Sequence, residues 1–295
     1  MKILITGSTG QLGTDCTAVF SVEHQVTPLS EQELDITDSA AVHRAIRAAK
    51  PEVVLNCAAF TRVDACESEI EQTWKINVEG PVILARSIKE AGGRLVHIST
   101  DYVFDGTREI PLPYVEDDTP GPLSRYGASK HEAEEAVRHI LADATIVRTA
   151  WLYGATGTNF LKTMLRLSLQ NPNRTIKVVS DQFGSPTWSF RLAQQLIKLI
   201  QHGGGGIYHA TAEGYCTWYE LARYFLSAMN VPFNLVPCST ADYPTPAVRP
   251  RNSILENKRL KSETINLMRP WHTDVEAFVL LHSQSLLAEA CGAVL

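Results

Sequence analysis

The chain has 295 residues with a formal net charge of -5, and 44% of them are hydrophobic, which excludes a disordered chain and argues against a general nucleic-acid binder. No apolar run approaches the roughly 20 residues of a membrane span, and Met1 leads directly into a strand-like segment, so we expect a cytoplasmic protein without a signal peptide. The six cysteines are scattered without a Cys-x-x-Cys pair, which favours reduced thiols over a zinc site.

The first predicted strand, residues 2–6, is an apolar run that leads into a glycine-rich turn and a helix. Gly7, Gly10 and Gly13 would let the backbone turn sharply, approach a pyrophosphate and pack the helix on the strand. The N-terminus of that helix would offer free N–H groups to the phosphates. The position of this turn directly after the first strand favours a dinucleotide site over a purely structural turn.

The end of the second predicted strand bears on the choice of cofactor. Many nicotinamide-binding folds carry an acidic residue there for the ribose 2′-hydroxyl. Here the strand ends in Ser30, which neither repels nor clamps a 2′-phosphate, so we expect a modest preference for NADPH, with NADH also accepted. Asp38 or Thr37 is expected to cap the next helix. Asp35 and Ile36 could flank an adenine, and a turn role for Asp35 is about equally well supported.

Two further predicted strands end at the same edge of the sheet. Residues 51–59 finish in small side chains, which leave room for a ligand in the crevice. Residues 94–100 bring Thr100 there, where a hydroxyl could hold a carbonyl oxygen, although β-propensity alone would also explain a threonine. The helix predicted around residues 74–91 contains Asn77, and a polar residue in such a helix is usually exposed, so the pattern leaves its role undecided.

Tyr126 and Lys130 stand four residues apart in a segment of helical character, so they share one helix face. A fixed cation favours the phenolate and would bring the tyrosine pKa down from about 10 towards neutrality. Tyr126 could then give a proton to a substrate oxygen or take one from it. An ordinary surface pair is the competing interpretation, because Tyr-x-x-x-Lys often occurs by chance.

The alternation of strands and helices predicts an α/β fold with a doubly wound parallel sheet of the Rossmann type and a smaller, interleaved C-terminal substrate domain. We expect a dinucleotide-binding domain at 1–150, to which 185–210 returns, and a substrate-binding region at 151–184 and 211–295. Arg249 and Arg251 lie in a rigid basic loop of that region, where they would suit a diphosphate. A solvated loop is the alternative, since most such charges are exposed.

Eight motifs between Met1 and about Trp271 carry a family resemblance. They are Gly-x-x-Gly-x-x-Gly at 7–13, Glu-Leu-Asp-Ile-Thr-Asp at 33–38, Asn-Cys-Ala-Ala-Phe-Thr-Arg-Val-Asp at 56–64, Ser-Thr-Asp-Tyr-Val-Phe-Asp-Gly at 99–106, Tyr-Gly-x-x-Lys, Arg-Thr-x-Trp-Leu-Tyr, Asp-Gln-x-Gly-x-Pro-Thr and Arg-Pro-x-Asn-Ser. Together they resemble the extended short-chain dehydrogenase/reductases and, among these, the dTDP-4-dehydrorhamnose reductase family.

The resemblance implies NADPH-dependent reduction of the C4 keto group of dTDP-4-dehydro-L-rhamnose to dTDP-L-rhamnose, a precursor of surface polysaccharides. Thr100, Tyr126 and Lys130 would form the catalytic triad, in which Tyr126 protonates the sugar oxygen and Lys130 also binds the nicotinamide ribose. The nucleotide-sugar substrate would lie against Asp101, Tyr102 and Trp151, with Arg249 and Arg251 as candidates for its diphosphate. The implied cofactor contacts are Gly7, Gly10, Gln11, Leu12, Gly13, Ser30, Asp35, Ile36, Ala58, Ala59, Thr61, Asn77, Tyr126 and Lys130.

Several alternatives stay open. Some relatives dimerise through a magnesium ion held by glutamates, and that set has no match here, with Asp15 the nearest candidate, so no metal ligand is assigned and Mg²⁺ and a homodimer are undecided. A reductase or epimerase of another nucleotide deoxy-keto-sugar would use the same triad. A 4,6-dehydratase is disfavoured, because Asp101 is followed by Tyr102 where dehydratases carry an Asp-Glu pair. A non-catalytic regulatory subunit, like the β subunit of methionine adenosyltransferase, is the alternative from another class.

Overall fold

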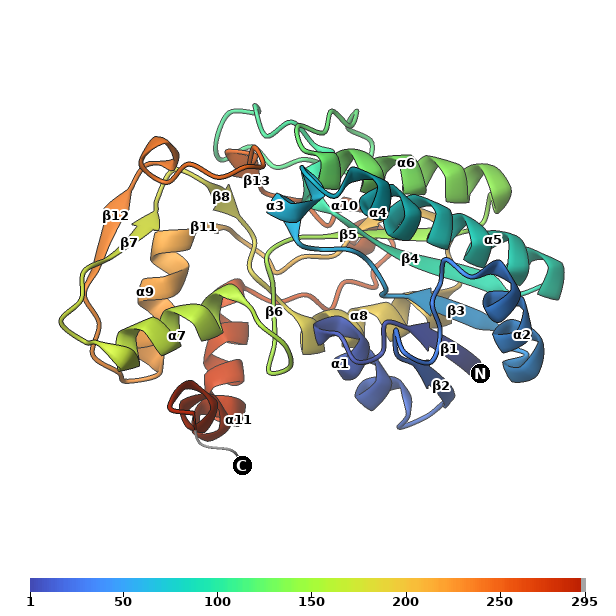
Figure 1. The fold of residues 1–295 in the computed structure, drawn as a ribbon, viewed down its shortest axis with the longest axis horizontal. Coiled ribbons are helices and arrows are strands. Elements are labelled where there is room, and N and C mark those ends of the chain that lie inside the picture. The colour runs from blue at the N-terminus through green and yellow to red at the C-terminus, as the bar shows by residue number, and fades with distance from the viewer. Residues whose placement is uncertain (293–295) are drawn as a thin grey trace.

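The computed structural model describes residues 1–292. A six-stranded parallel sheet lies at the centre of the fold (Figure 1). Its strand order is β2-β1-β3-β4-β5-β10. The strands are β1 (Lys2–Thr6), β2 (Gln25–Leu29), β3 (Val53–Asn56), β4 (Arg94–Thr100), β5 (Thr145–Thr149) and β10 (Gly206–His209). The order reverses on either side of β1, which is the doubly wound arrangement with its crevice at the carboxyl edge. The predicted Rossmann-type sheet is confirmed.

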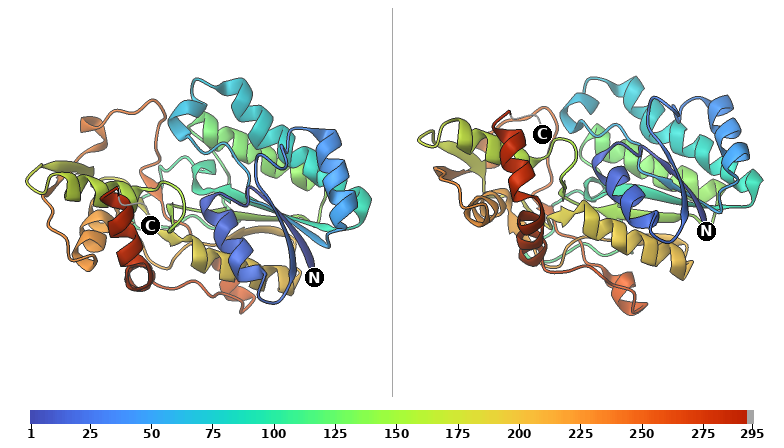
Figure 2. Two further views of the ribbon diagram at one scale, coloured as in Figure 1. Left: turned by 60° about the horizontal axis from the view of Figure 1, so that its bottom comes forward. Right: turned by 90° about the horizontal axis from the view of Figure 1, so that it is seen from below.

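Helices cover both faces of this sheet, because its strands are apolar on both sides. On one face Ile3 and Ile5 pack against α1 (Gln11–Phe20) and α8 (Ser189–His202). On the other face Leu4 packs in the cluster built by α2 (Ser39–Ala49), α5 (Gly80–Ala91) and α6 (Arg125–Ile140). Figure 2 shows the two helical layers obliquely and from below. Although both follow residue 185 in the sequence, β10 is a strand of this sheet and α8 packs against it.

Two short helices and a π-helical turn lead from β3 into α5. These segments are α3 (Val63–Cys66), α4 (Ile70–Trp74) and the π turn Lys75–Glu79, which runs directly into α5. A 3-10 turn, Asp101–Val103, follows β4. The segment between β3 and α5 and the 3-10 turn after β4 each follow the carboxyl end of a strand. Ligands bind at this edge in such sheets.

Three further helices form a second cluster beside the sheet (Figure 1). They are α7 (Phe160–Gln170), α9 (Trp218–Ala228) and α11 (Trp271–Ala290), which pack with three small sheets. Those sheets consist of β11 (Cys216–Thr217) with β8 (Phe183–Gly184) and β13 (Asn252–Ser253), β12 (Leu235–Cys238) with β7 (Ile176–Val179), and β6 (Leu152–Tyr153) with β9 (Thr187–Trp188). Among residues 1–292, no helix is both long and apolar enough to cross a membrane.

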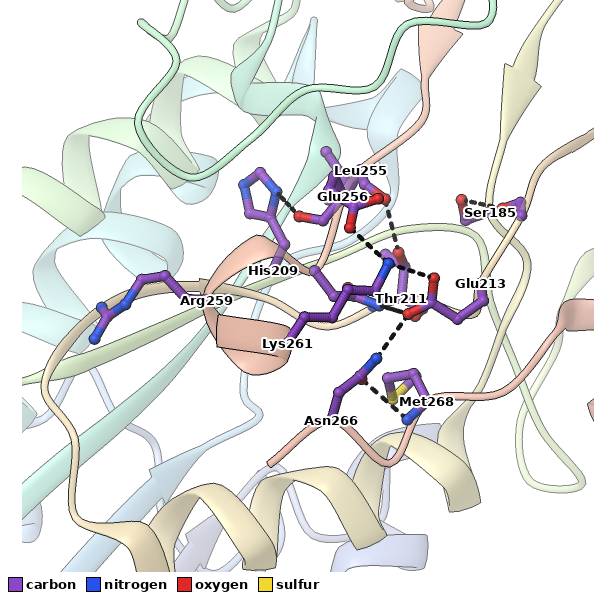
Figure 3. Close-up of polar contacts among 12 residues, drawn as sticks. Ser185, His209, Thr211, Glu213, Leu255, Glu256, Arg259, Lys261, Asn266 and Met268 are labelled. Carbon is purple, nitrogen blue, oxygen red and sulfur yellow. Dashed lines mark hydrogen bonds and ion pairs between the residues drawn. The ribbon is translucent and has the colours of Figure 1, made fainter. Parts of the chain in front are cut away.

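A polar cluster around Glu213 ties the segment after β10 to the short helix α10 (Lys258–Ser262) and the chain beyond it (Figure 3). The carboxylate accepts from Asn257 Nδ2 at 3.0 Å, Asn266 Nδ2 at 2.8 Å and Lys261 Nζ at 2.8 Å. Burial opposes ionisation of Glu213, but these donors outweigh it and hold its pKa below the ordinary value. The cluster therefore anchors the chain where it passes from the sheet to the second helical cluster.

Candidate active site

The glycine turn after β1 has the tight geometry that the sequence suggests. Gly7 has φ +65°, and a Cβ there would lie 2.8 Å from the backbone N and Cα of Ala58. A Cβ at Gly13 would collide with the Gly7 carbonyl oxygen. Gly10 is the N-cap residue of α1, and no side chain caps that helix, so its first N–H groups face outward for an anion.

Two adjoining cavities meet at this turn and share Gly7, Gly10 and the loop after β3. The first cavity, about 1150 Å³, runs over the end of β2 and is lined by Asp35, Ile36, Ala58, Ala59 and Thr61 among others. The second cavity, about 690 Å³, runs toward the second helical cluster. The predicted residues that line the second cavity are Gln11, Leu12, Gly13, Thr100, Asp101, Tyr102, Tyr126, Lys130 and Trp151. The structure thus joins the glycine turn and the proposed triad in one continuous space.

Glu33 is hydrogen-bonded to Ser30 just beyond the end of β2, although neither residue lines the first cavity. Its carboxylate accepts hydrogen bonds from Ser30 N–H at 2.8 Å and from the Ser30 hydroxyl at 2.7 Å. These two bonds lower the pKa of Glu33 below its ordinary value. An acidic group therefore does occupy the end of β2, and the Ser-x-x-Glu spacing of a capping box was its sequence signal.

Asp35 and Asn77 make mainly structural contacts. Asp35 Oδ1 accepts from both the N–H and the hydroxyl of Thr37 at 2.8 Å, which is the turn role, while the residue also lines the first cavity. Asn77 is 1% exposed, not exposed as its helix position suggests, and lines neither cavity. It binds the N–H and C=O of Phe60 and the Ser129 hydroxyl, so it fixes the loop after β3 against α6.

The lowered tyrosine pKa expected from the Tyr-x-x-x-Lys spacing is wrong for this structure. Burial of the hydroxyl end raises the pKa of Tyr126 well above its ordinary value, and the carboxyl of Asp101 adds to the rise. A hydrogen bond with Thr100 opposes these effects without cancelling them. Lys130 is not among the groups that lower this pKa, and its Nζ lies 3.2 Å from Nε2 of His97 on β4. Tyr126 is therefore a protonated phenol, which suits an acid.

Asp101 is a carboxyl group beneath the second cavity with only one of its oxygens bonded. Its Oδ1 accepts from the Thr100 hydroxyl at 2.9 Å, while Oδ2 has no hydrogen-bond partner among the described residues. Burial raises the pKa of Asp101 to about 6, and the hydrogen bond from Thr100 offsets this only in part. The N–H of Tyr102 donates to Thr100 Oγ1 at 3.2 Å, so the 3-10 turn after β4 holds the threonine in place.

Trp151 lines the second cavity in an indole stack that sequence reasoning missed. Its backbone is in the left-handed region, with φ +48°. One ring face stacks on Trp218 at the start of α9, with ring centroids 3.6 Å apart and planes 8° apart. Gly184 packs so closely against the indole that a Cβ there would collide with it. Trp218 also lines the cavity, and no local pattern links two residues so far apart in the chain.

The family model of the RmlD substrate-binding domain matches residues 1–283. The chain belongs to this family. It is 42% identical over 276 residues to a dTDP-4-dehydrorhamnose reductase of Streptomyces griseus, covering 91% of this chain and 90% of that protein. It is 38% identical over 284 residues to a dTDP-4-keto-6-deoxy-D-glucose reductase of Streptomyces niveus, covering 95% of this chain and 97% of that protein. The family resemblance inferred from the motifs is confirmed.

A solved structure shows the same fold in the RmlD family. The dTDP-4-dehydrorhamnose reductase of Bacillus anthracis in complex with NADP superposes with a TM-score of 0.91 at 37% identity, covering 95% of this chain and all of that one. The fold described above, with its sheet and its second helical cluster, is therefore shared with the whole length of that reductase.

The two arginines of the basic loop do not line either cavity of this RmlD family member. Arg249 forms a two-point ion pair with Asp64 of α3, at 3.0 Å and 2.9 Å, and Asp64 also accepts from the N–H of Ala247. Arg251 is exposed. The loop is thereby fastened to α3, and the Arg249 guanidinium is paired with a carboxylate.

Asp15, the nearest candidate for a metal ligand, is instead hydrogen-bonded to the Ser189 hydroxyl of α8. Its pKa is raised, chiefly by burial. Within residues 1–292, no group of three or more His, Cys, Asp and Glu side chains is arranged to hold a metal ion. The described residues therefore supply no ligand set to which Mg²⁺, or a dimer bridged by it, could be assigned.

Proposed function

We propose that this chain is an NADPH-dependent reductase that converts dTDP-4-dehydro-L-rhamnose to dTDP-L-rhamnose by reducing the C4 keto group. The observation that carries the proposal is the single space that joins the uncapped glycine turn to Thr100, Tyr126 and Lys130. The dTDP-4-dehydrorhamnose reductases among the relatives support the substrate. Residues 1–150 with 185–210 would hold the cofactor, and 151–184 with 211–295 would hold the sugar.

The side chains of the second cavity suit a carbonyl reduction, in which a hydride is added to the carbon and a proton to the oxygen. The nicotinamide supplies a hydride when it is bound. Tyr126 holds a proton at its phenol oxygen, since its raised pKa keeps it protonated, and gives that proton to the C4 oxygen as negative charge develops there. Thr100 orients the carbonyl, and Lys130 holds the ribose of the cofactor. Asp101, Tyr102 and Trp151 would bound the sugar.

The cofactor site fits a dinucleotide. A Cβ at Gly7 or Gly13 would clash with backbone atoms of the loop after β3 or of the turn itself, so glycine permits the tight turn that a dinucleotide site needs. The first N–H groups of α1 lack a side-chain cap and are free for the phosphates. NADP in the related Bacillus anthracis reductase supports NADPH as the cofactor. The Glu33 carboxylate beside Ser30 works against a 2′-phosphate, so we expect the preference for NADPH over NADH to be modest.

We expect Glu33→Gln to raise the ratio of kcat/KM for NADPH to that for NADH by about two- to fivefold, because exposed charges interact weakly across solvent. Steady-state kinetics with both cofactors measure this ratio. Glu31→Gln is the comparison variant, since Glu31 lines the first cavity and Glu33 does not, and the larger change in the ratio identifies the carboxylate nearer the 2′-phosphate. An unchanged ratio in Glu33→Gln would place the 2′-phosphate elsewhere.

We expect Trp151→Ala to raise KM for the keto-sugar by about 2- to 12-fold, with NADPH affinity near wild type, because an aromatic contact contributes about 0.5–1.5 kcal/mol. Kinetics with varied sugar and a cofactor titration separate the two effects. Trp218→Ala frees the stacked face of Trp151 and shows whether the sugar uses that face. Equal losses in sugar and cofactor binding for Trp151→Ala would make Trp151 a packing residue.

A second substrate is favoured by one observation, the 38% identity to a dTDP-4-keto-6-deoxy-D-glucose reductase. The decisive experiment incubates the protein and NADPH with each keto-sugar in turn, follows NADPH oxidation and identifies the product by NMR. Stoichiometric oxidation with dTDP-4-dehydrorhamnose supports the proposal and excludes an epimerase, which consumes no free cofactor. Turnover of dTDP-4-keto-6-deoxy-D-glucose alone would support the proposed keto-sugar reduction but show that the proposed substrate is wrong. Turnover of neither sugar would overturn the proposal.

A further inference from the structure

A buried row of polar side chains runs beneath Lys130 from three strands of the sheet. The Thr6 hydroxyl donates to Asn56 Oδ1 at 2.6 Å, Asn56 Nδ2 lies 3.0 Å from His97 Nδ1, and His97 Nε2 lies 3.2 Å from Lys130 Nζ. All four side chains are at most 2% exposed. Every donor and acceptor in such a row must be matched, because an unmatched buried polar group is costly.

The orientation of the Asn56 amide is fixed by the backbone. The N–H of Ala58 points at Asn56 Oδ1, 3.2 Å away, and a backbone N–H is always a donor. Turning the amide over would set Nδ2 against that N–H, donor against donor. The Asn56 oxygen therefore faces Ala58 and Thr6, and its Nδ2 donates to His97.

The orientation of Asn56 decides the tautomer of His97. A nitrogen that accepts a hydrogen bond carries no proton, so Nδ1 of His97 is the unprotonated nitrogen. Burial lowers the pKa of His97 well below its ordinary value, so the ring is neutral. Its single proton therefore lies on Nε2 and points at Lys130 Nζ.

The contact between His97 and Lys130 is then matched only by a neutral amine. An ammonium has three donors and no lone pair, so Nε2–H and –NH₃⁺ would face each other as two donors. A neutral amine accepts the bond. Burial lowers the pKa of Lys130 to about 8, against Glu134 on its own helix and Cys57 behind β3, which raise it. These groups, His97 on β4 and Tyr126 one turn earlier on α6 are the titratable neighbours of Lys130.

We propose that His97 is a positioning residue that, as its Nε2–H tautomer, holds Lys130 and favours its neutral amine. The consequence for catalysis rests on the proposed function. After Tyr126 gives its proton to the substrate oxygen, the phenolate takes a proton from the Lys130 ammonium, and the amine left behind accepts the hydrogen bond of His97. Solvent returns a proton to Lys130 when the products leave, so the cycle balances with no further reactant.

The tautomer is tested by ¹⁵N–¹H correlation NMR on the full chain labelled with [¹⁵N]histidine. The chain has nine histidines, and His97→Phe identifies the signals of His97 by their loss. We expect an unprotonated Nδ1 and a protonated Nε2 throughout the neutral range. A proton on Nδ1 would overturn the inference without touching the proposed function. A protonated Nε2 in a protein that turns over neither keto-sugar would leave this inference standing and remove the function.

Asn56→Asp supplies a second test, because a carboxylate only accepts. His97 would then have to present Nδ1–H, leaving Nε2 to accept from the Lys130 ammonium. We expect the NMR signals to exchange roles and the loss of NADPH affinity with rising pH to move to higher pH, measured by nicotinamide fluorescence. Thr6→Val is the matched control, since it removes one bond to Asn56 Oδ1 and leaves the Ala58 N–H, so the tautomer should stay. An Nδ1 that remains unprotonated in Asn56→Asp would refute the mechanism.

Discussion

Tyr126→Phe is expected to lower kcat for the keto-sugar by about 10² to 10⁴, the usual contribution of a positioned general acid. Hydride addition to a ketone builds negative charge on oxygen, and Tyr126 is the buried phenol that carries a proton into the second cavity. The substitution removes that proton and almost no volume, so the pocket should keep its shape. Single-turnover reduction measured beside NADPH affinity separates the lost chemistry from any lost binding.

The raised pKa of Tyr126 adds a pH criterion to this prediction. A phenol that stays protonated up to strongly alkaline pH remains a competent acid, so Tyr126 itself should cause no fall in kcat between pH 6 and about 9. Tyr102→Phe is the matched control, because that ring packs edge-on against Tyr126 with centroids 5.6 Å apart and also lines the cavity. We expect it to lose much less. Near-normal turnover by Tyr126→Phe would show that another group is the acid.

The parts of the site that the sequence could predict are those encoded by local pattern. The apolar run at 2–6 with its glycines matches β1 and the turn, and Asp38 caps α2 through the Ala41 N–H. Each depends on neighbours within a few residues, such as a strand period, a helix period or a cap. Such rules also place Tyr126 and Lys130 on one face.

The parts that the sequence could not predict depend on burial and on distant partners. The spacing of Tyr126 and Lys130 does not predict the burial that raises the pKa of Tyr126 and lowers the pKa of Lys130. It also does not predict the contact of Lys130 with His97 on β4. Trp218 reaches Trp151 only through the docking of α9 beside the sheet. Asn77 looks like a surface residue in its helix, yet the loop after β3 closes over it.

A second large effect is expected from a buried ion pair behind the site. Arg148 on β5 donates to Glu134 on α6 through Nε at 3.0 Å and through one terminal nitrogen at 2.6 Å, and the two side chains are 1% and 0% exposed. The Ser99 hydroxyl donates to the same carboxylate. We expect Glu134→Gln to lower the free energy of unfolding by about 3–5 kcal/mol, because it leaves the Arg148 charge buried without its partner.

The pH dependence separates this ion pair from a packing effect. Burial opposes ionisation of Glu134, yet the nearby His131 and the hydrogen bonds from Arg148 and Ser99 outweigh it and lower its pKa to about 2, from an ordinary value of 4.5. A depressed carboxyl pKa stabilises the fold above the unfolded pKa, and this contribution is lost as the pH falls toward the folded one. The gap between wild type and Glu134→Gln in denaturant unfolding should therefore be constant above about pH 5 and shrink from pH 4.5 toward 2.

The control for this prediction removes both charges. Glu134→Leu combined with Arg148→Met replaces the pair by apolar side chains of similar volume, and such a replacement is often neutral or stabilising because neither ion has to be desolvated. We expect the double variant to unfold at a higher denaturant concentration than Glu134→Gln, and its stability to lack the acid-dependent change between pH 4.5 and 2. A double variant less stable than the single one would mean that the Ser99 and Arg148 hydrogen bonds, rather than the buried charges, hold β5 to α6.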